Sequence, residues 1–499
     1  MSRSIPPLDL MFLLTETADS PKHVSALMTF DAPAAGARAP VRELVRAFRA
    51  AKPVAPFTYV PEFPLTGAPR WKSAASVDLL RHVHHLALPA GAGEDTLLEV
   101  VQRLHETVMD RSRPGFEVFF IEGLAGGGFA VFVRLHHAIV DGASAMALLL
   151  ASMNDAATAK RIEPFYAVQL SAPRPRPPKS LLDRVTALQK TARSQTAAVA
   201  GLTVGLVKKS LSRLLGGGKS GSEPFSAPRT PLNDRLRTAR SIATLSLPLA
   251  EMKAAGKAFG GTLNDVAVTV VDAGLQRYLA GLGLSSGQPL VVMCPISLRE
   301  PGDKEATTKV TAMFVPLGPR ALTVAERMRT TMAHAVAAKD ELRKMSKDTA
   351  MLYAIAAFGL AEAEAELSHR APAPTRPLAN FVLSNVPGSA TPLYLGGARM
   401  NGMYPISSIA AGMGLNVTLA SYAGSMDFGF VGNGVALPHL STLARHTQEA
   451  FDELKAAAAA LAPSADTAVP DVAATKRVSR KRAARTTAAG RRSPVEARR

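Results

Sequence analysis

The residues of this chain best suited to chemistry are two adjacent histidines, His136 and His137. They lie in the stretch RLHHAIVDGASAM (134–146), where Asp141 and Gly142 follow them closely. A neutral imidazole near its ordinary pKa can remove a proton from a hydroxyl group at neutral pH. The pair also fits a structural role, in which one histidine caps a helix and the other fills core. The Asp-Gly pair between a strand and a helix favours the functional interpretation.

The residues before the histidines indicate how the two side chains are placed. The stretch FVRLHH (132–137) reads as the end of a strand, in which successive side chains point to opposite faces. His136 and His137 therefore cannot face the same cavity unless the chain turns between them. One is the candidate base, and the other packs or orients. Asp141 can hold the loop by an ion pair or by hydrogen bonds, and Gly142 gives backbone freedom or close approach.

A histidine base suits acyl transfer from an activated donor such as a thioester. Such a donor needs no covalent nucleophile on the protein. The chain has no G-x-S-x-G elbow, and its single cysteine, Cys294, has no evident role as a nucleophile. The residues therefore favour direct attack by an alcohol whose proton passes to the histidine.

Three more histidines stand close together in RHVHHLALP (81–89) and form a candidate metal site. An alternating strand would divide them between two faces, and no nearby Cys or Asp completes a coordination shell. We therefore expect no metal ion at this segment.

Length and composition favour a globular protein of two domains. The chain has 499 residues, of which 47% are hydrophobic and 20% charged. No apolar run approaches the roughly 18 residues of a membrane-spanning helix. The N-terminal apolar run in MSRSIPPLDLMFLL is short and contains Asp9, so it does not resemble a signal peptide. With only one cysteine, these features predict a cytosolic protein that is not exported.

Composition divides the chain into four parts. The predicted domains cover 1–168 and 237–462, the linker covers 169–236, and the tail covers 463–499. The linker is apolar on one face and basic on the other, and it fits either a surface helix that joins the domains or a helix in a membrane interface. The tail holds ten Lys or Arg residues between 476 and 499, which contribute to the formal net charge of +18. It fits a disordered, solvated segment or contact with an anionic membrane surface, and we expect no specific nucleic acid partner.

Hydrophobic periodicity predicts both strands and helices along the chain, and so an α/β (α+β) fold. Strands are expected at 23–31, in FEVFFIEGL and GGFAVFVRLHH before the motif, and at 289–300 and 381–389. Helices are expected at 40–51 and 95–110 and from about Leu263. A hairpin is expected at 414–433, with its turn at Ala423-Gly424-Ser425.

The motif His136-His137-x-x-x-Asp141-Gly142 matches HHxxxDG of the chloramphenicol acetyltransferase-like and condensation-domain superfamily. Five further stretches resemble the bacterial wax ester synthase/diacylglycerol acyltransferase family. The resemblance covers about residues 5 to 460 apart from the linker. The stretches are PPLDLMFLLTETADSPKHVSALMTF (6–30), DRSRPGFEVFFIEGL (110–124), LNDVAVTVVDAGLQRYL (263–279), VTAMFVPLG (310–318) and LSNVPGSATPLYLGGARM (383–400).

The resemblance implies a fold and an activity. It implies two chloramphenicol acetyltransferase-like domains, each with mixed sheets and flanking helices, and an active site in a channel between them. It implies esterification of diacylglycerol or a long-chain fatty alcohol by acyl-CoA, which makes triacylglycerol or wax ester without an acyl-enzyme. Acyl-CoA is then a substrate, and no cofactor is expected. It also implies a peripheral protein at the inner membrane face or on lipid inclusions, which the linker and tail would contact.

The resemblance also assigns roles within the motif. His137, the second histidine, corresponds to the general base, and His136 stands beside it. Asp141 corresponds to a structural aspartate that pairs with an arginine of the second domain, for which Arg299 in CPISLRE is the candidate. Gly142 would leave room for the acyl donor.

Three supporting residues lie in the second half of the chain. Asn264 and Asp265 match the Asn-Asp motif of the family, and TLND (262–265) can also cap the helix that follows. Asn385 lies in SNVPG at a strand end. Its side chain could position substrate or shape the turn, and the residues favour the turn.

The chain departs from the family pattern at three places. It has Gly115-Phe116 where the family has Leu-Trp after a proline, Thr308 where the family has Asn, and Asn433 where it has Asp. These departures bear on substrate range and efficiency, while His137 and Asp141 are intact. The alternatives to the acyltransferase are a member of the superfamily that uses a carrier-protein thioester and an inactive protein that binds a lipid surface.

Overall fold

The computed structural model describes eight segments of the chain: 2–32, 41–159, 161–169, 225–285, 287–297, 310–345, 347–370 and 376–461. Most of the predicted linker, Arg299, Thr308 and the predicted basic tail lie outside these segments. Residues 1–461 form one compact unit.

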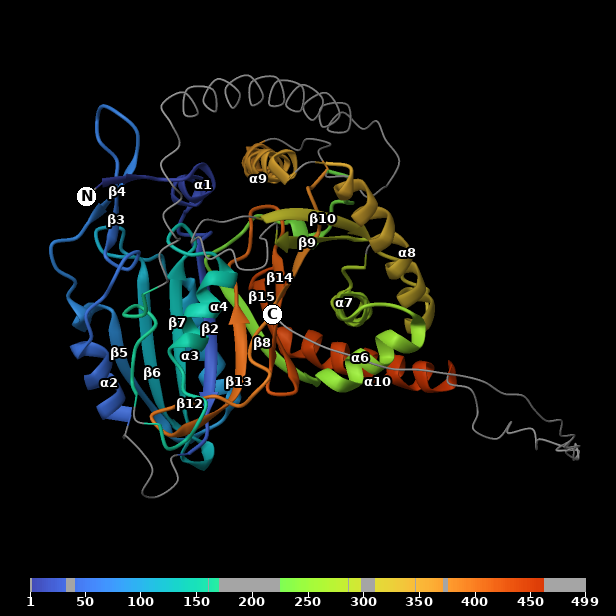
Figure 1. Cartoon of the computed structure of the whole chain (residues 1–499). Coiled ribbons are helices and arrows are strands. Elements are labelled where there is room, and N and C mark those ends of the chain that lie inside the picture. The colour runs from blue at the N-terminus through green and yellow to red at the C-terminus, as the bar shows by residue number, and fades with distance from the viewer. Residues whose placement is uncertain are drawn as a thin grey trace, which may run out of the picture. The chain divides into compact units, whose positions relative to one another are not determined.

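The histidine motif follows the central strand of the first six-stranded sheet (Figure 1). The order in this sheet is β12 (Tyr394–Leu395), β13 (Ala398–Ile406), β2 (His23–Phe30), β7 (Phe129–His136), β6 (Phe116–Leu124) and β5 (Val83–Ala92). β5 and β6 run parallel, whereas the other neighbours run antiparallel. β7 is buried along its whole length, which suits its Phe, Val and Leu side chains.

Helices cover both faces of this sheet. α2 (Val41–Ala50) and α4 (Gly142–Ala151) share one apolar cluster with its strands, and α3 (Glu94–Glu106) contributes Leu97 and Val101 to the cluster on the other face. Ile242 and Val431 of the second half also join the second cluster. This face of the first sheet is therefore where the two halves of the chain meet.

The second six-stranded sheet is also mixed. Its order is β10 (Val310–Pro316), β9 (Val291–Ser297), β11 (Phe381–Val386), β14 (Leu415–Tyr422), β15 (Ser425–Asn433) and β8 (Arg240–Pro248), with β11 parallel to both neighbours. The predicted hairpin is confirmed as β14–β15. Its turn residues Ala423 and Gly424 have φ values of 44° and 94°, as a two-residue hairpin turn with positive φ requires.

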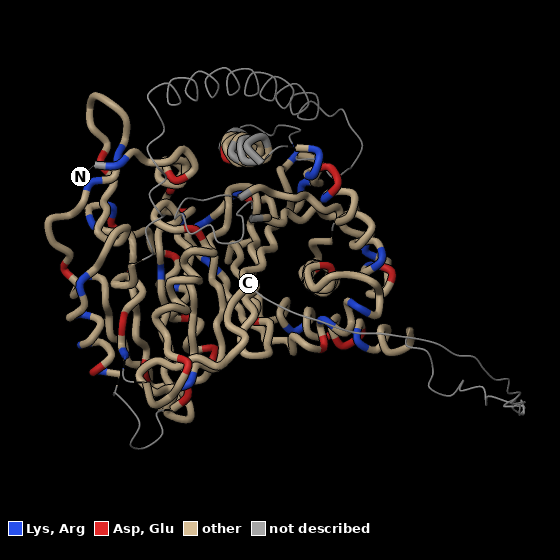
Figure 2. The backbone as a smooth tube through the Cα atoms, viewed as in Figure 1, with Lys and Arg blue, Asp and Glu red and all other residues tan. Residues whose placement is uncertain are grey.

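Four helices share the large apolar cluster on one face of the second sheet: α6 (Leu249–Phe259), α7 (Leu263–Gly281), α8 (Val324–Arg343) and α10 (Leu440–Leu461). α8 and α10 carry Lys and Arg together with Asp and Glu (Figure 2). α9 (Lys347–Arg370) packs on the opposite face with the segment that begins at Phe225. Two-sided cover is what a sheet with internal parallel strands needs.

Strand pairing does not follow a simple division into consecutive halves. The predicted second domain, 237–462, contains β12 and β13, but both strands belong to the first sheet. β13 pairs with β2 from Met400 to Ile406. Without it β2 would be an edge strand with unpaired amides and carbonyls, so the exchange closes that edge.

β13 crosses very near β15 of the second sheet. The Met403 amide donates to Oδ2 of the buried Asp427 at 2.9 Å. A Cβ at Gly429 would lie 1.8 Å from the carbonyl oxygen of Pro405. Only a residue without a side chain allows this approach.

Most of the expected elements are confirmed, with one difference at α3. Strand 23–31 appears as β2, helix 40–51 as α2, and α7 starts at Leu263. The expected helix at 95–110 ends earlier, at Glu106, because Nη1 of Arg134 donates to the carbonyl groups of Leu104 and Thr107.

A small three-stranded sheet joins β1 (Ser2–Ser4), β4 (Arg70–Ser73) and β3 (Tyr59–Glu62), and α1 (Pro7–Thr15) follows β1. Among the residues described, no helix combines the length and apolar character that crossing a membrane requires.

The crossing of β13 and β15 predicts that Gly429→Ala destabilises the fold. The added methyl group would meet a backbone carbonyl, which no side-chain rotation can relieve, so the free energy of unfolding should fall by about 2 kcal/mol or more. Urea unfolding followed by circular dichroism measures the change. The matched control is Gly359→Ala in α9, where a Cβ meets nothing within 4 Å and helix propensity should raise stability by about 0.5–1 kcal/mol. Equal stability of the two variants would contradict this account.

Candidate active site

Backbone hydrogen bonds from both sides fix the two histidines of the motif. His136 ends β7, and its amide donates to the carbonyl of Gly115 at 2.8 Å. The His137 amide donates to the carbonyl of Lys22, just before β2, also at 2.8 Å. The chain then turns, since the Ile139 amide donates to the His136 carbonyl at 2.9 Å. The candidate base is therefore held between the starts of β6 and β2.

The His136 side chain is buried and oriented by two contacts. Its Nδ1 accepts a hydrogen bond from the Ala138 amide at 3.1 Å, so the ring proton of the neutral form lies on Nε2. Nε2 is 3.5 Å from Oε2 of Glu16. This supports the expectation that one histidine of the pair orients the loop rather than meeting substrate.

Glu16 is a functional candidate that the sequence did not reveal. Its side chain is almost fully buried, and its oxygens accept from the Lys22 amide at 3.0 Å and from Nε of Arg111 at 3.0 Å. Burial by itself raises the pKa of Glu16, but the contact with His136 and the other two hydrogen bonds outweigh it, so the net pKa is lowered. A carboxylate at this position therefore stays charged. The only signal in the sequence was its place shortly before β2.

The His137 ring stacks on Phe12 of α1, with ring centroids 4.1 Å apart and planes inclined by 22°. Burial lowers the pKa of His137 below 6.5, although its own backbone carbonyl and the charge of Asp141 partly offset this. The charges of His136 and Lys22 act in the same direction as burial. The imidazole is therefore held neutral at neutral pH, the form that a general base needs.

Asp141 and Gly142 form the start of α4. Asp141 is buried and is the N-cap residue, with Oδ1 accepting from the Ser144 amide at 2.7 Å. A Cβ at Gly142 would meet no atom within 4 Å, so this position opens onto free space. Both positions fit the roles that the sequence suggested, but the expected partner of Asp141, Arg299, lies outside the described residues.

The structure brings together two of the three supporting residues. Asn385 in β11 donates from Nδ2 to Oδ1 of Asn264 in α7 at 2.8 Å. Asp265 closes the capping box with Thr262 and accepts from its amide at 2.8 Å and its hydroxyl at 2.7 Å, so the predicted helix cap is confirmed. Asn385 ties the end of β11 to the start of α7, whereas the sequence favoured a role in shaping its own turn.

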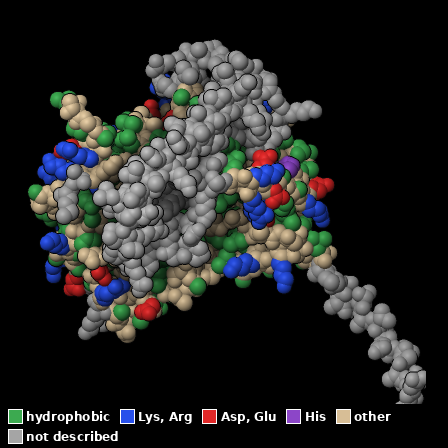
Figure 3. All heavy atoms as spheres, turned by 45° about the horizontal axis from the view of Figure 1, so that its top comes forward, with side chains coloured by type: hydrophobic (Ala, Val, Ile, Leu, Met, Phe, Trp, Pro, Cys, Tyr) green, Lys and Arg blue, Asp and Glu red, His purple; other side chains and the backbone are tan. Residues whose placement is uncertain are grey.

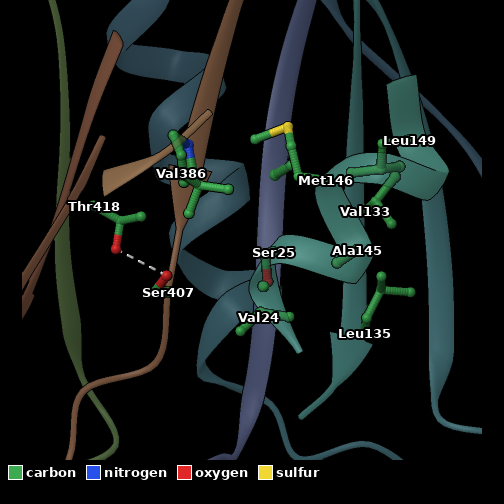
Figure 4. Close-up of a pocket in the computed structure, with 13 residues that line it drawn as sticks. Val24, Ser25, Val133, Leu135, Ala145, Met146, Leu149, Val386, Ser407 and Thr418 are labelled. Carbon is green, nitrogen blue, oxygen red and sulfur yellow. Dashed lines mark hydrogen bonds between the residues drawn. The ribbon is translucent and has the colours of Figure 1, made fainter. Parts of the chain in front are cut away.

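A narrow apolar pocket lies beside the motif, between the two halves of the chain (Figure 4). One face of α4 points into it with four residues at helical spacing, and strands of both sheets supply the rest. At its polar edge Thr418 donates to Ser407 at 3.0 Å. The residues that line the pocket are Val24, Ser25, Ala26, Val133, Leu135, Gly142, Ala145, Met146, Leu149, Val386, Pro405, Ser407 and Thr418.

A second histidine pair lies behind the motif. His23 is opposite His136 in the β2–β7 register, and its Nε2 is 3.0 Å from Nδ1 of His105 in α3. Burial, followed by the charges of Arg240 and Arg134, lowers the pKa of His105 to about 3. Both rings are therefore neutral, and one donates its N–H to the other. Their hydrogen bond joins α3 to the start of β2, next to the end of β7 that carries the motif.

The three histidines considered as a metal site have separate partners. His82 Nδ1 donates to the Phe116 carbonyl at 2.7 Å, the His84 ring stacks on Phe119, and His85 Nε2 lies 3.3 Å from Glu122. Within the described parts of the chain, no group of three His, Cys, Asp or Glu residues is placed to hold a metal ion.

Two of the departures from the family pattern occupy defined places. Gly115 lies against His136, where an added Cβ would come 2.7 Å from the Cβ of that histidine. Phe116 is fully buried at the start of β6 and stacks on His82. Asn433 is buried at the end of β15 and donates to the Arg235 carbonyl at 2.9 Å. Gly115 therefore bears on the motif itself, while Phe116 and Asn433 pack within the fold.

Comparison with known proteins agrees with this geometry. A family model described as the wax ester synthase/diacylglycerol acyltransferase catalytic domain matches residues 5–267, and one described as the WS/DGAT C-terminal domain matches 307–455. Two Mycobacterium tuberculosis proteins named as diacylglycerol O-acyltransferases are 33% and 34% identical. The alignments cover 91% and 90% of this chain and 98% and 99% of theirs.

Solved structures resemble the chain along most of its length. The wax ester synthase/diacylglycerol acyltransferase from Marinobacter aquaeolei VT8 has a TM-score of 0.71 at 28% identity, covering 92% of this chain and all of that one. The first condensation domain of the calcium-dependent antibiotic synthetase has a TM-score of 0.55 at 17% identity, covering 93% and 98%. The second likeness concerns the fold alone, and it supports the expected chloramphenicol acetyltransferase-like architecture.

The environment of His137 predicts that its ring stays mostly neutral at pH 6.5. Because burial lowers its pKa below that value, the ring gains its proton only as the pH falls further. Carbon NMR of protein labelled at the histidine rings would follow the titration, and His137→Asn would assign the signal by its loss. A midpoint at or above pH 6.5 would contradict the predicted environment.

Proposed function

Because the chain belongs to the wax ester synthase/diacylglycerol acyltransferase family and is an O-acyltransferase, we propose that His137 is its general base. The acceptor hydroxyl gives its proton to the imidazole, and its oxygen attacks the thioester carbonyl carbon of acyl-CoA. The tetrahedral intermediate collapses with cleavage of the carbon–sulfur bond. The imidazolium then returns the proton to the leaving thiolate, and no acyl-enzyme forms.

The observation that carries this proposal is the neutral imidazole of His137 in a stretch whose neighbouring residues Leu135 and Gly142 line an apolar pocket. A protonated histidine could not accept the proton, and a fully solvated site would expose the thioester to water. Glu16 contacts His136, and His136 in turn accepts from the Ala138 amide. These contacts hold the loop in place and leave the His137 ring available to the substrate. His136 and Glu16 are therefore positioning residues in this mechanism.

Asp141 has a structural part in the proposal. It caps α4 and so fixes the turn between the base and the helix that lines the pocket. The charge of Asp141 also raises the pKa of His137, which favours the imidazolium formed when the proton is accepted. Pairing of Asp141 with Arg299 remains a prediction. Asn264 and Asn385 join α7 to the end of β11, and Asp265 caps the same end of α7.

We assign the apolar pocket to an acyl chain or the hydrocarbon part of the acceptor. Its lining is mostly Val, Leu, Ala and Met, and Gly142 adds no side chain where a Cβ would meet no atom within 4 Å. The names of the M. tuberculosis relatives refer to diacylglycerol, and that of the Marinobacter protein adds wax ester. Diacylglycerol and long-chain fatty alcohols are therefore the proposed acceptors, and acyl-CoA the donor. The matches do not favour an inactive lipid-binding protein or a carrier-dependent enzyme.

The proposed acceptors are insoluble in water, so the enzyme is expected to work at a membrane or lipid-inclusion surface. One exposed feature supports this. The β3–β4 hairpin presents Leu65, fully exposed, and Phe63, 46% exposed. Beside them are the exposed basic residues Arg70 and Lys72, which share the single carboxylate of Glu62 and so leave a net positive charge. Hydrophobic and basic side chains are both exposed on the side from which the hairpin projects (Figure 3). Apolar tips flanked by cations are typical of groups that enter anionic lipid interfaces.

The mechanism predicts that His137→Ala lowers ester formation by about a hundredfold or more, the usual contribution of a general base. Purified protein would be given labelled palmitoyl-CoA with dioleoylglycerol or hexadecanol, and the ester product counted. His446→Ala, on α10 far along the chain, is the control and should keep wild-type activity. Full activity of His137→Ala would remove this residue from the mechanism, and a wild type inactive with both acceptors would remove the proposed substrates.

The surface assignment predicts that Phe63→Asp/Leu65→Asp weakens binding to vesicles of phosphatidylglycerol and phosphatidylcholine. Each carboxylate would have to leave water for the lipid interface, so the bound fraction in sedimentation should fall clearly below wild type. Val435→Asp is the control, because Val435 is likewise an exposed apolar residue, 67% exposed, but follows β15 in the other half of the chain. If the two proteins sediment alike with vesicles, the hairpin is not the lipid contact.

A further inference from the structure

Lys22 is a buried lysine at the centre of the contacts that hold the motif. Lys22 is only 4% exposed to solvent. Its amide donates to Glu16 at 3.0 Å, and its carbonyl accepts from the His137 amide at 2.8 Å. The backbone of Lys22 is therefore the direct link between the buried carboxylate and the base.

The side chain of Lys22 leads away from the motif to the second half of the chain. Nζ donates to Oε1 of Glu362 in α9 at 2.9 Å and to Oγ of Ser20 at 2.9 Å. Lys22 and Glu362 are 340 positions apart in sequence. In Figure 1, α9 lies next to α1, the helix that carries Phe12, and the two helices touch each other.

α9 is held in place by several contacts with the second half of the chain. Ala357 and Ala361 lie in the apolar cluster that covers this face of the second sheet, and the larger side chains of Tyr353, Phe358 and Leu360 pack against the same cluster. Glu364 of the same helix also forms an ion pair with Arg229. These contacts hold α9 against the second sheet, and the ion pair of Glu362 with Lys22 in addition ties α9 to the residue whose carbonyl accepts from the His137 amide.

We propose that Lys22 is a positioning residue for the base, and that its ion pair with Glu362 couples the placement of His137 to helix α9. This proposal rests on the assignment of His137 as the general base. A shift of α9 would pull on the Lys22 side chain, and the Lys22 carbonyl would carry that movement to the His137 amide. The rate of acyl transfer would therefore depend on the position of α9, and so on how the second half of the chain packs against the first.

The charge of Lys22 gives the proposal an electrostatic signature. The charges that act on His137 include those of Asp141 at the start of α4, His136 at the end of β7 and Lys22 before β2. Two buried carboxyl groups also lie on neighbouring elements, Asp9 in α1, the helix whose Phe12 stacks on the ring, and Glu16 beside His136. Lys22 lowers the pKa of His137. Loss of its charge should therefore raise that pKa and move the acid limb of the rate profile to higher pH. A role in packing alone would not move this limb.

The test compares Lys22→Met, Glu362→Gln and the reversed pair Lys22→Glu/Glu362→Lys by pH profiles of kcat/KM with palmitoyl-CoA and dioleoylglycerol. Lys22→Met should move the acid limb to higher pH and lower kcat by roughly tenfold, as expected for a misplaced catalytic group. Glu362→Gln should lower kcat without moving the limb upward, because the lysine charge remains. The reversed pair should regain folding stability but show the largest upward movement of the limb.

The control is Lys455→Met, which makes the same chemical change in the ion pair of Lys455 with Glu251, also at 2.9 Å but on the exposed helices α10 and α6. It should leave both kcat and the acid limb unchanged. A wild-type profile for Lys22→Met would overturn the proposal. If Lys22→Met does not fold, the reversed pair decides, and an unmoved limb there would overturn it too. His137→Ala, measured alongside, separates this outcome from failure of the assigned base.

Discussion

The close crossing of β13 and β15 is the constraint on which the rest of the structure depends. β13 belongs to the first sheet and β15 to the second, and they approach so nearly that the Pro405 carbonyl occupies the place of a side chain at Gly429. Asp427 meets the hydrogen-bonding need of the Met403 amide at the same point. A buried amide requires a partner, so this carboxylate fixes how closely β13 and β15 approach each other. The crossing of these two strands therefore sets the distance between the two halves of the chain.

The pocket beside the motif is a consequence of that distance. Pro405 and Ser407 lie at the end of β13, Val386 and Thr418 come from the second sheet, and Gly142 comes from α4. Neither half of the chain supplies enough apolar surface to enclose a hydrocarbon chain by itself. The exchange of β13 into the first sheet therefore both completes β2 and builds a wall of the pocket.

Around the base, buried charges occur with partners. Glu16 is satisfied by Lys22, Arg111 and the nearby His136, and Lys22 by Glu362. Removal of one member of a buried pair typically costs about 3–5 kcal/mol, because the other charge remains without compensation. The network therefore resists rearrangement, which suits a loop that must present one imidazole in one orientation. Burial then lowers the pKa of that imidazole, so rigidity and a neutral base have the same origin.

By itself the sequence determined the local features. The apolar run of β7, the Thr262–Asp265 cap of α7, the Ala423-Gly424 turn and the His-His-x-x-x-Asp-Gly spacing all depend on neighbours in the chain, and each could be read from the sequence. The tertiary structure decided the contacts between distant residues. The sequence did not reveal that Glu16 meets His136, that Lys22 reaches Glu362, that Asn385 bonds Asn264, or that β13 joins the first sheet. Periodicity reports which face of an element is buried, but the partner across that face depends on the folding of the whole chain.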